Sequence, residues 1–268
     1  MTGAPVAAPV HPITTGWRRA ALLALAVTVA APTPLSARTP TGSAGEERVL
    51  APFSTAAPGE PPRAWVERTL ADIAPNRWQI VAAEGAHVLE ARSSRSASSL
   101  AHGVPGPVAD ASRLDWRWWT ERFPRGGALG AKASDDFPAR VYVLFDYPLH
   151  KLPLQQRVAV RLARALHGED VPAAALCYVW DAAAPTETLA ESPYTSRVRM
   201  IVASSGAAGR WATVSRDIAA DFQRAFGAEH GPGMPPIRAI VVGADSDQTG
   251  DTLLTRFGDL RLGRPAAR

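Results

Sequence analysis

The residues best suited to recognise a ligand are arginines and aromatic residues that alternate with apolar residues in several short segments. In residues 139–146, Arg140, Tyr142 and Asp146 share one parity, and two valines and a phenylalanine take the other. Alternate side chains of a β-strand point to opposite faces of the sheet. We therefore expect each such strand to present one plain apolar face and one face of arginine, aromatic and acidic side chains.

Similar alternation occurs in residues 114–121, 175–181 and 197–202. If these strands are neighbours in one sheet, their arginine and aromatic side chains lie on one surface. The predicted face comprises Arg117, Trp119, Arg140, Tyr142, Asp146, Tyr178, Trp180, Arg197 and Arg199. Aromatic rings stack on the C–H face of a sugar while polar groups bond its hydroxyls, and arginines also suit carboxylate or sulfate groups. The alternative is a solvated outer face whose arginines pair with acids. The sequence supports both interpretations equally.

A short acidic string follows the apolar residues 239–243 and has the composition of a cation-binding loop. Its oxygen-bearing residues are Asp245, Asp247, Thr249 and Asp251. Closely spaced oxygen ligands around a glycine turn suit calcium, although Arg256 stands where an EF-hand has its bidentate glutamate. The alternative is a turn held by Asx hydrogen bonds. The DxDxT opening of haloacid-dehalogenase-like phosphotransferases also matches, but only 17 residues follow Asp251, too few for their other motifs.

Two other reactive features have a structural interpretation that we favour. Asp135 and Asp136 lie in the polar, Gly-rich residues 126–136 and resemble the acid and base of a glycosidase. Adjacent residues of one loop rarely face each other across a substrate, so we expect solvated loop acids. Cys177, the only cysteine, lies in the apolar residues 173–180, which predicts a buried thiol rather than a nucleophile. A single cysteine also means that the fold has no internal disulfide.

Most of the chain reads as short strands rich in β-branched and aromatic residues, separated by Gly, Pro and Asp, which favours an all-β sandwich. The predicted strands span residues 49–54, 77–83, 87–91, 97–102, 114–121, 139–146, 175–181, 197–204, 237–244 and 255–262, with a hairpin turn at 84–86. Two accessory helices are expected at 153–167 and 216–226, where apolar residues recur about every four positions. In the first, we expect Leu154, Val158 and Leu162 to cover the sandwich and the arginines to face water. The alternative is a cationic amphipathic helix lying on a membrane.

The N-terminus predicts export from the cytoplasm. Arg18 and Arg19 precede an apolar run of about 12 residues, the length of a signal-peptide core and too short to span a bilayer. Small residues at 35–37 then suit cleavage. We expect residues 1–37 to be a signal peptide, 38–48 a flexible lead-in and 49–264 a single β-sandwich domain in the periplasm or outside the cell. The mature chain has no segment long and apolar enough to span a membrane.

The charge of the chain gives little support to nucleic-acid binding. The net charge is +4 and the pI is about 9.7, but the leader carries two of the arginines, which leaves the mature chain near +2. No basic run is present, so we expect no nucleic-acid partner.

Several strings, in this order, resemble an uncharacterised exported bacterial family catalogued as domain of unknown function 3047. They span residues 114–118, 132–136, 139–146, 176–180, 197–202, 245–250 and 257–259. The resemblance covers Phe53 to Leu262, with departures at Trp119, Gln248 and Phe257. It implies a strand order and Gly-Asp ending similar to galactose-binding-like jelly rolls, which often bind sugars and sometimes a structural calcium ion. It implies no catalytic residue.

Three function classes follow from these residues and this resemblance. We expect an exported, non-catalytic β-sandwich that binds a carbohydrate or another cell-envelope component, with no cofactor apart from the calcium ion considered above. The first alternative is a jelly-roll carbohydrate-active enzyme, a polysaccharide lyase or glycoside hydrolase, with Asp146, Tyr142 and arginines in its site. The second is a structural or partner-binding envelope protein without a small ligand.

Overall fold

A computed structural model describes residues 48–104, 112–167 and 171–264. The predicted signal peptide, residues 1–37, and all of the predicted lead-in except its last residue lie outside the described residues. No helix in the described part of the chain is long and apolar enough to cross a membrane.

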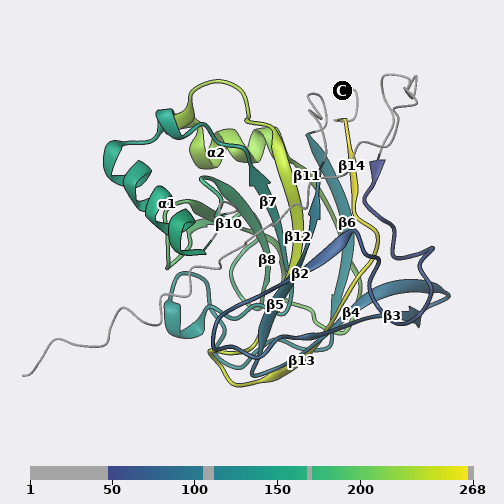
Figure 1. The fold of residues 1–268 in the computed structure, drawn as a ribbon. Helices are drawn as coiled ribbons and strands as arrows, with labels where there is room; N and C mark the ends of the chain where they lie inside the picture. The colour runs from purple at the N-terminus through teal and green to yellow at the C-terminus, as the bar shows by residue number, and fades with distance from the viewer. Residues whose placement is uncertain (1–47, 105–111, 168–170, 265–268) are drawn as a thin grey trace, which may run out of the picture.

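Two mainly antiparallel sheets of seven strands each form a sandwich (Figure 1). Sheet I contains, in spatial order, β1 (Arg48–Val49), β14 (Arg261–Gly263), β6 (Arg113–Thr120), β13 (Thr252–Phe257), β4 (Ala86–Ser94) and β3 (Arg77–Ala83), with β11 (Ala212–Asp217) also paired to β6. Sheet II contains β2 (Trp65–Thr69), β5 (Ala97–Gly103), β12 (Ile237–Asp245), β7 (Arg140–Phe145), β8 (Ala175–Asp181), β10 (Val198–Ser205) and β9 (Leu189–Glu191). The chain passes repeatedly from one sheet to the other, as in a jelly roll. The predicted all-β, jelly-roll-type sandwich with two accessory helices is confirmed.

Aromatic side chains from both sheets fill the space between them. Trp118 of β6 stacks on Trp180 of β8 with ring centroids 5.8 Å apart, and Trp116 lies 5.4 Å from Tyr178. Offset and tilted ring pairs add about 0.5–1.5 kcal/mol each to the stabilisation from area burial. The fold is therefore held by packing, and the single thiol of Cys177 is buried and free, as expected.

Helix α2 (Ile218–His230) closes one end of the space between the sheets. The Asp217 side chain accepts a hydrogen bond from the Ala220 amide at 3.0 Å and so caps the first turn. Phe222 packs against Phe145 of β7 with ring centroids 4.8 Å apart. The predicted apolar face of this helix is therefore buried.

Helix α1 (Leu154–His167) lies beside sheet II, and its orientation corrects the sequence-based expectation (Figure 1). Leu154, Val158 and Leu162 are 71%, 55% and 59% exposed, whereas Val160 is buried. Val160 and Ala163 lie on the side of the helix that faces the sheet, where they line a cavity. The leucine row therefore does not cover the sandwich, and the alternative of a helix lying on a membrane stays a prediction.

Other departures from the expected elements are local. β2, β9 and β11 were not predicted, the expected strand 49–54 shrinks to β1, and 255–262 divides into β13 and β14. Two short 3₁₀ helices, η1 (Lys132–Ser134) and η2 (Leu149–Lys151), precede and follow β7. The predicted hairpin turn is confirmed, with Glu84 and Gly85 both at positive φ.

Candidate functional site

The register of sheet II divides the predicted arginine and aromatic face between two surfaces. Tyr142 of β7 pairs with Cys177 of β8, and Val141 pairs with Tyr178. Paired residues point to the same side of a sheet, so Tyr178 and Trp180 face sheet I, and Arg140 and Tyr142 face outward. The prediction that all these residues share one face is wrong, because parity within a strand does not reveal its register with the neighbouring strand.

The other predicted residues are also dispersed. Arg117 and Trp119 belong to sheet I, where Arg117 lies over Trp211 at 4.5 Å and Arg256 lies over Trp119 at 4.9 Å. Asp146 is exposed just beyond β7, and Arg199 lies over Phe226 of α2 at 5.2 Å. Arg197 lines the surface described below, so three of the nine predicted residues, Arg140, Tyr142 and Arg197, remain together there.

Two adjoining hollows form a groove on the outer side of sheet II. The smaller, called here the polar hollow, has a volume of about 30 Å³. The larger, the α1 cavity, has a volume of about 260 Å³ and lies between α1 and β10. Both are lined by Asp135, Arg140, Tyr142 and Tyr194. These four residues form a wall that the two hollows share.

Arg140 is the centre of a buried acidic cluster at one end of the groove. Its Nε donates to Asp245 Oδ1 at 3.1 Å, and its Nη2 lies 2.6 Å from Asp245 Oδ2 and 3.3 Å from Asp135 Oδ2. Arg140 is 3% exposed, and Asp135 and Asp136 are 3% and 1% exposed. The expectation of solvated loop acids is therefore wrong, because Asp135 pairs with a buried guanidinium.

Asp136 ties the loop before β7 to the turn after β12. Its Oδ2 accepts hydrogen bonds from the Thr249 amide and the Thr249 hydroxyl, both at 2.6 Å. Its Oδ1 accepts a bond from the Gln248 amide at 3.3 Å. Gly250 completes the turn with a φ of 72°, a conformation that glycine adopts without strain. Asx-type bonding, the alternative interpretation of the 245–251 string, therefore describes this turn in part, with a second loop supplying the acceptor.

The charge balance of the cluster shifts the ionisation of its members. Burial, together with the nearby charges of Asp136 and Asp135, raises the pKa of Asp245 to about 7 despite its pairing with Arg140. Burial also raises the pKa of Asp135 and of Asp247. Among the described residues these acids outnumber the one guanidinium that contacts them, so their mutual repulsion and burial favour the protonated form of Asp245.

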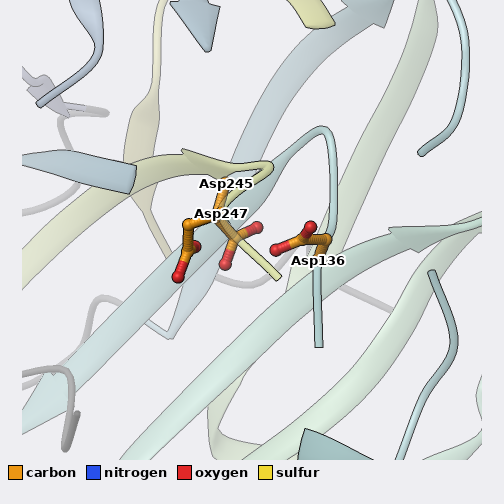
Figure 2. Close-up of side chains that lie close together, drawn as sticks. All are labelled: Asp136, Asp245 and Asp247. Atoms are coloured by element: carbon orange, nitrogen blue, oxygen red, sulfur yellow. The ribbon is translucent and has the colours of Figure 1, made fainter. Parts of the chain in front are cut away.

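The carboxylates of Asp136, Asp245 and Asp247 approach within 4.8 Å of one another and form the group best placed to hold a cation (Figure 2). Two of the four residues predicted for calcium are not part of this group. Asp251 instead contacts Arg122 at 2.9 Å and the Arg125 amide at 2.7 Å, and the Thr249 hydroxyl donates to Asp136.

The contacts of these carboxylates fit calcium poorly. Calcium requires six to eight oxygen ligands. Both Asp245 oxygens already face Arg140, and both Asp136 oxygens accept N–H or O–H bonds. The Asp247 carboxylate contacts no guanidinium among the described residues, but it accepts a bond from the Gln248 side-chain amide at 2.6 Å, so we derive no role for a metal ion.

Two buried polar atoms on the shared wall of the groove have no oxygen or nitrogen hydrogen-bond partner among the described residues, although the Cys177 thiol lies within bonding reach of one of them, the Tyr142 hydroxyl. They are the Tyr142 hydroxyl, on a side chain whose residue is 3% exposed, and Asp135 Oδ1. An unpartnered buried polar atom costs about 1–3 kcal/mol, and ordered water or a ligand commonly satisfies it. The shared groove wall therefore carries one hydroxyl group and one carboxylate oxygen whose hydrogen-bonding capacity the described residues do not fill.

Sequence reasoning missed Tyr194, Asp135 and Asp247 as parts of one site. Tyr194 lies between β9 and β10, with Lys132 Nζ 5.5 Å from its ring centroid, and no local pattern distinguishes it. Asp135 and Asp247 each stood out as acidic, but only the pairing of β7 with β12 brings them together. The strings 132–136, 139–146 and 245–250 that carry the family resemblance all supply residues to this groove.

Comparison with solved structures yields only low similarity scores. The family 11 carbohydrate-binding module of cellulase Lic26A-Cel5E of Clostridium thermocellum is 8% identical, with 84% of this chain and 99% of that chain covered and a TM-score of 0.41. The xyloglucanase domain of NopAA from Sinorhizobium fredii is 9% identical, with coverages of 82% and 99% and a TM-score of 0.40. The K1 adhesin domain of Lys-gingipain from Porphyromonas gingivalis is 10% identical, with coverages of 83% and 100% and a TM-score of 0.38. Scores this low carry no argument about the ligand.

The sequence itself gives the stronger assignment. No curated protein matches the chain. A family model does match residues 63–261, which include both sheets almost completely and every residue of the shared groove wall. The chain belongs to the family described as Protein of unknown function (DUF3047).

Proposed function

We propose that this protein is an exported, non-catalytic carbohydrate-binding β-sandwich whose ligand occupies the groove on sheet II. The observation that carries the proposal is the pair of buried, unpartnered atoms on the shared groove wall, the Tyr142 hydroxyl and Asp135 Oδ1. A sugar hydroxyl both donates and accepts hydrogen bonds, so one saccharide unit can satisfy both atoms. The half-buried ring of Tyr194 on the same wall offers a surface for the C–H face of a sugar.

The composition of the groove wall favours a neutral saccharide over an acidic one. The acids Asp135, Asp245 and Asp247 line the polar hollow with Arg140, whose guanidinium is already engaged by two of them. A carboxylate or sulfate on the ligand would meet these three acids at close range, against one further arginine of the hollow, Arg68, whose Nη1 donates to the Glu67 carbonyl. This replaces the sequence-based expectation that arginines would suit acidic sugars.

A hydrolytic function is the second candidate, and one observation favours it. A carboxyl group with its pKa raised to about 7, as in Asp245, can donate a proton near neutral pH, which is the task of a glycosidase general acid. Both Asp245 oxygens face Arg140, however, and the Asp136 carboxylate is held by the neighbouring turn. Binding without turnover is therefore the function that this geometry supports best.

A panel of soluble polysaccharides tests both candidates. We expect retention without released products for the native protein, and about 5- to 30-fold weaker retention for Tyr194→Ala and Asp135→Asn, because each removes about 1–2 kcal/mol of contact. Trp211→Ala is the matched control, since it removes a ring from the far side of sheet I. Released products would identify an enzyme, and neither retention nor products would favour a structural or partner-binding envelope protein.

Export is tested separately from binding. Expression of the full chain in a bacterial host should yield a periplasmic or secreted protein whose first residue is Arg38. Retention of the unprocessed chain in the cytoplasm would contradict the export proposal and leave the binding proposal intact.

A further inference from the structure

The α1 cavity differs in chemistry from the polar hollow that it adjoins. Its apolar wall is formed by Ala159, Val160, Ala163, Val171, Val198 and Met200. An apolar cavity of about 150 Å³ is large enough to bind benzene, and the α1 cavity has about 260 Å³. It can therefore hold an apolar group larger than one aromatic ring.

The two hollows share one wall. Asp135, Arg140, Tyr142 and Tyr194 line both, so a molecule that contacts this wall can place one group in each hollow. The polar hollow, with about 30 Å³, offers carboxylates and a hydroxyl to a single polar group, and the α1 cavity offers alanine, valine and methionine side chains. A ligand that matches both parts is amphipathic: one hydroxyl of its sugar reaches the polar hollow, and an apolar chain enters the α1 cavity.

We propose that the ligand is a saccharide carrying an alkyl or acyl chain, and that the α1 cavity binds this chain. The inference rests on the proposed carbohydrate site and adds the chemical class of the ligand. Gln156 and Arg197 also line the cavity. Arg197 Nη1 bonds Gln156 and Glu229, whereas its buried Nη2 has no hydrogen-bond partner among the described residues, so the cavity keeps one polar donor beside its apolar wall.

Three probes separate the head from the chain: methyl β-glucoside, octyl β-glucoside below its critical micelle concentration, and 1-octanol. Burial of one methylene group strengthens binding about fourfold. We expect calorimetric titration to show octyl β-glucoside binding at least about 50-fold more tightly than methyl β-glucoside, since three or more methylenes are buried. We expect 1-octanol to bind measurably and to compete with octyl β-glucoside.

Two substitutions that fill the cavity test its location. Ala163→Phe on α1 and Val198→Phe on β10 each place a ring in the cavity, and we expect either to remove most of the preference for the octyl compound. Ala165→Phe is the matched control, because Ala165 is exposed on the same helix and does not line the cavity. Thermal melting shows which variants are folded, and the comparison of probes on the native protein requires no variant.

The outcomes distinguish this inference from the function on which it rests. Equal affinity for the methyl and octyl glucosides, absence of octyl binding, or octyl binding unchanged in both cavity-filling variants would each overturn it. Polysaccharide retention together with equal glucoside affinities would leave the carbohydrate site standing. Tight octyl binding without any polysaccharide retention would support the cavity and contradict the general carbohydrate proposal.

Discussion

Two clusters of acids and arginines, one beside α2 and one in the groove, differ in the number of guanidinium groups that contact each carboxylate. Beside α2, Arg216 lies 2.7 Å from Asp221 and also contacts Glu187, which a second arginine, Arg224, approaches at 2.8 Å. Each acid there has at least one guanidinium. The arginines hold the pKa of Glu187 down at about 2.

In the groove, carboxylates outnumber guanidinium groups. Asp135 and Asp245 share Arg140, while Asp136 and Asp247 lie nearby without a guanidinium among the described contacts. Burial then raises the pKa of Asp245 to about 7. Beside α2, the arginines and acids balance in charge and the ion pairs stabilise the fold. In the groove, the acids outnumber the arginine, and some carboxylate oxygens have no charged partner. Such imbalance is more typical of binding sites than of structural ion pairs.

The largest expected effect comes from removing the central arginine of the groove. Arg140→Met leaves Asp135 and Asp245 buried without a counter-charge, and we expect it to lower the free energy of unfolding by about 3–5 kcal/mol at pH 8. Arg224→Met, at a more exposed pair, should cost no more than about 1 kcal/mol. Urea denaturation measures both. The cost of Arg140→Met should shrink at pH 5, where the acids are protonated; equal costs for the two variants would break the comparison.

The pH dependence of stability should have opposite signs in the two clusters. Folded Asp245 keeps its proton up to about pH 7 and the unfolded residue releases it near pH 4, so stability should fall as pH rises through this window, by at most about 1.4 kcal/mol per pH unit. Glu187 and Asp251, with pKa values of about 2, should contribute stability that is lost as pH falls from about 4 to 2.

Urea denaturation at pH values from 2 to 8 gives the free energy of unfolding as a function of pH, and the slope in each pH range separates these contributions. Asp245→Asn should flatten the decline between pH 4 and 7, and Glu187→Gln should flatten the acid limb. If Asp245→Asn left the slope between pH 4 and 7 unchanged, Asp245 would be ionised throughout that window and the groove would lack its shared proton.

Tyr178 and Tyr142 differ in the hydrogen bonding of their hydroxyl groups. The Tyr178 hydroxyl donates to Asp221 at 2.9 Å, whereas the Tyr142 hydroxyl has no oxygen or nitrogen partner among the described residues. Tyr178→Phe should lower stability by about 1 kcal/mol and leave saccharide binding unchanged. Tyr142→Phe should leave stability equal or slightly higher and weaken binding about 5- to 20-fold. Thermal melting and calorimetry on the same samples decide; a stability loss in both variants would give Tyr142 a structural role.

The sequence predicted the strands well because each carries its own alternation or its own apolar run. It could not predict which strands pair, and strand pairing determines which side chains come together in the site. Both faces of β7 and β8 are buried, so neither parity marked an outward side. Tyr178 and Tyr142 therefore looked equivalent until the register of the two strands separated them.

Long-range pairing also explains why the acidic cluster escaped prediction as a unit. Arg140 pairs with Gly243 across β7 and β12, which brings the residues before one strand against those after the other. Each acidic string was recognised alone, one as loop acids and the other as a metal loop. Their meeting depends on contacts more than 100 positions apart, as in the bonds from Gln248 and Thr249 to Asp136, which local patterns do not encode.

The smallest expected effect is that of calcium. A cation at Asp136, Asp245 and Asp247 would have to displace Arg140 and the Thr249 donors, so millimolar calcium should shift the melting temperature by less than about 1 °C. Chelated protein provides the baseline, and Asp247→Asn removes the only carboxylate of the three without such a donor. A calcium-induced rise of several degrees in the melting temperature, abolished by Asp247→Asn, would show that these acids bind a cation. The bound cation would then balance the charge of the groove acids, as the arginines do in the α2 cluster.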